Sequence, residues 1–69
     1  MTGAELFRVV QGLGYTVARQ SGSHRRMKCE GRPPLTFAFH DSASLPPGLV
    51  KKVLMQDAGL SEDQALACL

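Results

Sequence analysis

The chain has 69 residues, of which 43% are hydrophobic and 20% charged, and its formal net charge at pH 7 is +2. A chain of this length forms one small domain, because it buries only about 60% of the surface that its unfolded form exposes. The hydrophobic fraction is ordinary for a folded protein, and nothing in the composition indicates disorder. We therefore expect a single domain over residues 1–69.

The cysteine content and the apolar runs bear on the cellular compartment. Two cysteines, Cys29 and Cys68, are too few for the disulfide framework of a small secreted domain. No apolar run approaches the roughly 20 residues of a membrane-spanning helix. The N-terminus lacks the basic start and apolar centre of a signal peptide. We expect a cytoplasmic protein.

The N-terminal segment predicts an amphipathic helix over about residues 3–13. Thr2 and Glu5 have the three-residue spacing of a capping box. Apolar residues then recur with helical spacing, at Leu6, Val9, Val10 and Leu13. Gly14 is a natural end for this helix, because glycine readily adopts the left-handed conformation that follows many helices.

The central segment predicts three antiparallel strands. Residues 15–20 have a two-residue period, with Tyr15 and Val17 on one face and Thr16, Ala18 and Gln20 on the other, and residues 21–23 (Ser-Gly-Ser) form a turn. The second strand covers roughly residues 24–30. We expect residues 31–34 to form a loop, because prolines cannot donate hydrogen bonds to a sheet. The clearest alternation, over residues 35–40, predicts the third strand.

A three-residue turn fixes the pairing of the first two strands. The predicted pairs are Gln20–His24, Ala18–Arg26 and Thr16–Lys28. The predicted inward face consists of Tyr15, Val17, Met27, Cys29, Leu35, Phe37 and Phe39. The outward face carries a charged row on the second strand, His24, Arg26 and Lys28. The small residues on either side of this row are Thr16, Ala18, Thr36 and Ala38.

The C-terminal third predicts a helix that begins at Pro47 and ends at Gly59. Its apolar stripe consists of Val50, Val53, Leu54 and Ala58. Residues 61–64 repeat the capping-box spacing and open a short final helix with Ala65, Leu66 and Leu69. The element order αβββα, with this extra helix, predicts an α+β domain in which helices cover one face of a three-stranded antiparallel sheet.

Basic residues concentrate in one short segment. Five of the eight lie between residues 19 and 32, opposed there only by Glu30. Alternation places His24, Arg26 and Lys28 on one face of the second strand, where an imidazole beside two cations suits a phosphodiester ligand. The alternative is a solvated edge strand that its charges protect from aggregation.

Three motifs together resemble the HicA (YcfA-like) toxin family. They are a helix followed by Leu-Gly-Tyr at residues 13–15, Gly-Ser-His at 22–24 with an apolar residue at 27, and the run from Phe39-His40 through Leu-Pro-Pro-Gly at 45–48 to residues 53–62. Gly-Ser-His alone is weak, but the order and spacing over nearly the whole chain are specific. One departure is Leu49, where the family usually has a small polar residue.

The resemblance implies a double-stranded-RNA-binding-domain-like fold and metal-independent cleavage of RNA. It implies an endoribonuclease, an mRNA interferase, in which the histidine of Gly-Ser-His, here His24, does the chemistry. It also implies a HicB-like antitoxin that covers the active site. No cofactor and no metal are expected.

Cleavage of RNA without a metal needs a base for the ribose 2′-hydroxyl, cations for the charge on phosphate and an acid for the leaving oxygen. Histidine can serve as the base near neutral pH, and we assign that role to His24. Arg26 and Lys28 would stabilise the phosphorane. Arg25 also belongs to the candidate phosphate-binding set, although alternation points it inward.

Several weaker candidates complete the expected site. Gly22 and Ser23 belong to it as the turn that presents His24. His40 is a possible acid or phosphate contact, or only a strand-ending residue. A solvated helix face is favoured over RNA contact for Lys51 and Lys52. The spacings of His24, Cys29, His40 and Cys68 match no usual zinc pattern.

Two other classes of function stay open. The first is a non-catalytic RNA-binding module, since this kind of fold binds double-stranded RNA by shape and by 2′-hydroxyl contacts. The second is a protein-interaction domain whose exposed row binds an acidic partner.

Overall fold

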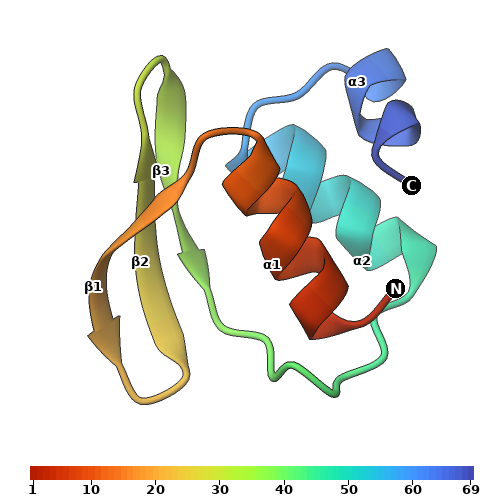
Figure 1. The fold of residues 1–69 in the computed structure, drawn as a ribbon. Helices are drawn as coiled ribbons and strands as arrows, with labels where there is room; N and C mark the ends of the chain where they lie inside the picture. Colours follow the sequence, from red (N-terminus) through yellow and green to blue (C-terminus); the bar gives the residue numbers. More distant parts are fainter.

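The computed structural model describes residues 1–69 and contains three α-helices, one π-helical turn and three strands (Figure 1). In chain order these elements are α1 (Gly3–Gly12), β1 (Thr16–Ser21), β2 (His24–Cys29), β3 (Arg32–Phe37), α2 (Pro47–Lys52), η1 (Val53–Asp57) and α3 (Glu62–Ala67).

The domain has two layers. The antiparallel sheet has the strand order β1-β2-β3, and α1 and α2 pack on one of its faces (Figure 1). The opposite face carries no helix. The α+β architecture predicted from the sequence is confirmed. None of the helices has the length and apolar content that crossing a membrane requires.

Helix α1 begins with the predicted capping box. The Thr2 hydroxyl accepts a hydrogen bond from the Glu5 backbone N–H at 3.2 Å, and the Glu5 carboxylate accepts one from the Thr2 N–H at 2.8 Å. Gly14 follows the helix with φ 107°, a conformation that residues with a Cβ rarely adopt. These local interactions explain why the boundaries of α1 could be predicted closely.

The core lies between the helices and the covered face of the sheet. Its largest fully buried side chains are Tyr15, Phe37, Leu6, Met27, Leu54, Val10 and Val50. Strand β1 contributes nothing to this core, because all six of its residues are exposed. The expectation that Val17 faces inward with the core is wrong, since its exposed fraction is 41%. Cys29 and Phe39, also expected inward, are half-buried.

The predicted pairing of β1 with β2 is mostly wrong, because the turn has two residues rather than three. Ser21 pairs with His24, and Gly22 has φ 59°, as the first central residue of a two-residue hairpin turn of type II′ requires. Of the predicted pairs only Thr16–Lys28 forms. A bulge between Val17 and Arg19 takes up the extra residue and restores the register at Val17–Met27.

Strand β3 also begins earlier than predicted. The two prolines at 33 and 34 lie within the strand, and the strand ends at Phe37 rather than at His40. Prolines are tolerated here because β3 is an edge strand and the ladder is irregular between Met27 and Cys29. The Pro33 carbonyl accepts a hydrogen bond of 2.7 Å from the buried Tyr15 hydroxyl. Three of the four residues of the expected loop, residues 32–34, are therefore part of the sheet.

The C-terminal third follows the predicted pattern with one addition. Pro47 lies in the first turn of α2, and the predicted apolar stripe of Val50, Val53, Leu54 and Ala58 is buried. Helix α2 continues into η1, where the Ala58 N–H donates to the Val53 carbonyl at 3.0 Å. A capping box between Ser61 and Gln64 opens α3, in which Ala65 is buried. Leu66 and Leu69 are exposed, so they take no part in the core.

Candidate functional site

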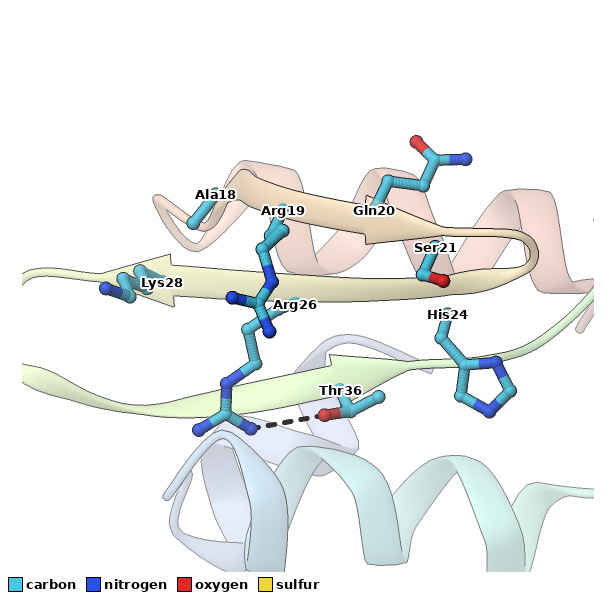
Figure 2. A pocket seen from close by; sticks show the side chains of 8 residues that line it. All are labelled: Ala18, Arg19, Gln20, Ser21, His24, Arg26, Lys28 and Thr36. Carbon is cyan, nitrogen blue, oxygen red and sulfur yellow. Dashed lines mark hydrogen bonds between the residues drawn. The ribbon is translucent and has the colours of Figure 1, made fainter.

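A hollow of about 530 Å³ lies on the uncovered face of the sheet. Strands β1 and β2 supply nearly all of its lining, and β3 adds a single threonine (Figure 2). The lining residues are Ala18, Arg19, Gln20, Ser21, His24, Arg26, Lys28 and Thr36. We call this surface the central hollow.

The structure brings together the histidine and two of the cations that the sequence singled out. His24 opens β2 and Lys28 lies near its other end, and Figure 2 shows Arg26 between them. The three residues alternate along one strand, so their side chains emerge on the same face. A hydrogen bond of 3.1 Å from the Arg26 guanidinium to the Thr36 hydroxyl fixes the side chain in the middle of the row (Figure 2).

Arg19 is a site residue that the sequence analysis missed. Strict alternation along the strand would put Arg19 on the same face as Val17. The bulge at Ala18 reverses the alternation, so Arg19 pairs with Arg26 and its side chain lines the central hollow (Figure 2). Counting Gly22-Ser23 as a two-residue turn would have paired Arg19 with Arg26 and so put Arg19 on the face of the basic row.

Every charged side chain that lines the central hollow is basic. Its lining includes three cations and a histidine but no carboxylate. The only ion pair in the protein joins Lys51 to Glu62 at 3.2 Å and ties α2 to α3. The cations of the hollow therefore have no anionic partner in the protein, and an anion from outside would meet them unneutralised.

The remaining predicted residues lie elsewhere. Arg25 projects to the covered face, where its guanidinium carbon lies 4.5 Å from the centre of the Phe7 ring. Arg25 lines a second hollow together with Gly22, Ser23 and His40, on the other side of the hairpin turn. His24 and His40 thus line different hollows. Lys51 and Lys52 line neither hollow.

No group of three or more His, Cys, Asp or Glu side chains is placed to hold a metal ion. The thiol of Cys29 instead contacts the main chain, with its Sγ 3.5 Å from the Leu13 carbonyl oxygen. Cys29 thus lies against the segment that joins α1 to β1.

The family comparison agrees with this architecture. A family model described as the HicA toxin of bacterial toxin–antitoxin systems matches residues 3–60, which comprise every element except α3. We find no curated protein and no solved structure that matches the chain. Since the match covers most of the chain and the helix, sheet and helix order is the one expected of that family, the protein belongs to the HicA toxin family.

Proposed function

We propose that the protein is a metal-independent endoribonuclease, an mRNA interferase, in which His24 is the general base. Toxins of this family are generally ribonucleases. The observation that carries the proposal is the central hollow, where one imidazole and three cations line an open surface without a carboxylate. This combination suits RNA, because the cations can bind the negatively charged phosphodiester and the imidazole can take a proton from the neighbouring 2′-hydroxyl.

The proposed reaction is an attack by the ribose 2′-oxygen on the adjacent phosphorus. His24 takes the proton of the 2′-hydroxyl, the bond from O2′ to phosphorus forms, and the bond from phosphorus to O5′ breaks. Arg26 and Arg19, which pair across β1 and β2, would face the phosphate oxygens as negative charge accumulates. The products are a 2′,3′-cyclic phosphate and a free 5′-hydroxyl.

The leaving O5′ must gain a proton, and His40 is poorly placed to give it because it lines the other hollow. His24 is the only side chain of the central hollow whose type exchanges protons near neutral pH. We therefore propose that the imidazolium formed in the first step, or water in contact with it, returns the proton to O5′.

A HicB-like antitoxin is the proposed protein partner. A toxin of a toxin–antitoxin system implies an antitoxin, and the uncovered basic face offers an acidic partner a surface to neutralise. We propose that the antitoxin covers the central hollow, and that toxin and antitoxin act in the cytoplasm, where mRNA is found.

The test compares the wild-type protein with His24→Ala on RNA in the presence of EDTA. General acid–base groups contribute roughly 10²–10⁴-fold to rate, so we expect His24→Ala to lose at least about 100-fold in cleavage. The RNA affinity and its salt dependence should change little, since the cations remain. His24 is exposed, so the thermal melts of the two proteins should match.

The products and the binding data separate the outcomes. Cleavage by the wild type alone, with 2′,3′-cyclic phosphate ends, supports the proposal. If both proteins bind RNA and neither cuts it, the domain is a non-catalytic RNA-binding module. If neither binds RNA even at low salt, the basic face serves a protein partner. Equal cleavage by both proteins would mean that His24 is not the base.

A further inference from the structure

A second hollow of about 480 Å³ adjoins the central hollow across the β1–β2 turn. We call it the turn hollow. The turn itself, the start of β2 and the segment that follows β3 supply its lining, which consists of Gly22, Ser23, Arg25, Phe39, His40, Asp41 and Ser42. The two hollows share no lining residue, yet they alternate along the same stretch of chain, since Ser21 and His24 line one while Ser23 and Arg25 line the other.

Arg25 is held in place but its hydrogen-bonding capacity is unused. Its half-buried side chain lies over the Phe7 ring at 4.5 Å, a cation–π contact that restricts the guanidinium. No carboxylate lies within 4.0 Å of it, and no protein acceptor takes its side-chain N–H groups. A guanidinium that is oriented in this way and lacks an acceptor is suited to bind a phosphate through two parallel hydrogen bonds.

The segment after β3, which lines part of the turn hollow, is tied to α1. The N–H of Ala4 donates to the Asp41 carbonyl at 3.1 Å, and the N–H of Gly3 donates to the Ala43 carbonyl at 2.9 Å. Gly3 has no room for a side chain, because the His40 carbonyl group occupies the position of a Cβ. The segment that carries His40 and Asp41 is therefore fixed against the start of the helix.

The remaining lining suits a nucleobase better than a bare phosphate ion. The half-buried Phe39 ring packs edge-to-face on Phe37 with the ring centres 5.3 Å apart, and exposed His40 follows it. Aromatic and imidazole faces stack on unpaired bases. The carboxylate of Asp41 repels phosphate but can accept N–H donors of a base. It forms no ion pair with Arg25 or His40.

We propose that the turn hollow is a second RNA subsite, which binds the nucleotide next to the cleaved phosphodiester. Its phosphate binds Arg25, and its base lies against Phe39 and His40. His24 and Arg25 are consecutive, with Cα atoms about 3.8 Å apart, so an RNA strand that crosses the Gly22-Ser23 turn passes from one hollow to the other. The inference rests on the proposed cleavage of RNA at His24. It also requires single-stranded RNA at the turn, because only an unpaired base can leave its stack.

The experiment measures how cleavage depends on substrate length. The substrates are a dinucleotide that contains only the cleaved step and a single-stranded oligonucleotide with the same step at its centre. The variants are Arg25→Gln, Arg25→Lys and His40→Ala, with Lys52→Gln as the control that removes one positive charge outside both hollows. Thermal melts of all proteins show whether loss of the contact with Phe7 has affected folding.

We expect the wild type to have a higher kcat/KM on the oligonucleotide than on the dinucleotide. In Arg25→Gln this advantage should fall about tenfold, mainly through KM, as expected for one charge-assisted contact to phosphate. Arg25→Lys should lose part of the advantage, because lysine keeps the charge but not the planar pair of donors. His40→Ala should also lose part of it, whereas Lys52→Gln should keep it.

Two results would overturn the subsite. The first is an unchanged length advantage in both Arg25→Gln and His40→Ala. The second is an equal loss in Arg25→Gln and Lys52→Gln, which would show only general attraction between charges. If the wild type cuts neither substrate, the proposed reaction fails. The subsite is then tested by the affinity of each variant for the uncut oligonucleotide. Weaker binding by Arg25→Gln than by Lys52→Gln then supports it, and equal binding rejects it.

Discussion

Tyr15 joins the start of β1 to the irregular part of β3. Its side chain is buried, with an exposed fraction of 2%, and its hydroxyl donates to the Pro33 carbonyl at 2.7 Å. Burial, with a smaller contribution from the neighbouring Cys29, raises the pKa of the Tyr15 phenol above 10.0. The sequence predicted that Tyr15 faces inward, but the hydrogen bond could not be predicted while residues 31–34 were expected to form a loop.

Replacing Tyr15 with phenylalanine tests this hydrogen bond. We expect Tyr15→Phe to lower the free energy of unfolding at pH 7 by about 1 kcal/mol, the usual net value of a hydrogen bond. The phenol has a higher pKa in the folded state than in the unfolded state, so its contribution is complete below about pH 10. It is lost as the pH rises from there through the folded-state pKa.

Urea unfolding of both proteins at pH 7 and near pH 11 measures the two effects. The difference in stability should shrink at the higher pH, because only the wild type has a phenol that ionises at position 15. A difference that stays constant with pH would contradict the assignment, as would a phenylalanine variant as stable as the wild type.

At the scale of elements, the two capping boxes make a natural pair. Both have the same hydrogen bonds, but α1 uses the carboxylate of Glu5 where α3 uses the neutral amide of Gln64. Hydrogen bonds from the Thr2 backbone and side chain lower the pKa of Glu5 from its usual 4.5. The charge of Glu5 also interacts favourably with the N-terminus of α1.

Glu5→Gln should therefore destabilise the protein at pH 7, and the difference from the wild type should disappear on acidification. A lowered pKa in the folded state means that the contribution is present above about pH 4.5 and is lost as the pH falls through the folded-state value. Thermal unfolding from pH 7 down to pH 3 measures this. Ser61→Ala is the control, since the box of α3 contains no titrating group and its effect should not depend on pH.

The elements also show where sequence reasoning succeeds and where it fails. The starts of α1 and α3 could be predicted because capping boxes are local. The buried stripes of the helices could be predicted because they follow helical spacing. The register of β1 with β2 could not, because it depends on whether Ser21 belongs to the turn or to the strand, and a one-residue slip moves each side chain to the other face. For the same reason, the position of Arg19 in the central hollow could not be predicted. The path of β3 was missed because prolines are compatible with an edge strand as well as with a loop.

At the scale of the whole molecule, the two faces of the sheet have separate roles. The helices cover one face and supply the core, while the other carries the central hollow. The molecule is thin, with principal extents of 31 × 29 × 17 Å. Helix α3 lies outside the residues that the family model matches, and it is held by Ala65 and by the pair of Lys51 with Glu62. The central hollow thus includes no residue from the part in which this chain extends beyond its family match.

The exposure of β1 has a consequence for the site. No side chain of β1 is buried, and β2 is the only element that it contacts extensively. Such a strand should open locally at a lower free energy than the rest of the protein. Each opening removes Arg19, Gln20 and Ser21 from the central hollow, while His24 stays on β2.

The proposed cleavage activity should therefore decline on heating before the helices melt. Amide hydrogen exchange should be faster over residues 16–21 than over α1, and the temperature at which cleavage is half lost should lie below the midpoint measured by helical circular dichroism. Equal protection of β1 and α1 would contradict this. If the strand does open first, the toxin is switched off by a reversible local event, and a molecule warmed past that point recovers its activity on cooling without having unfolded.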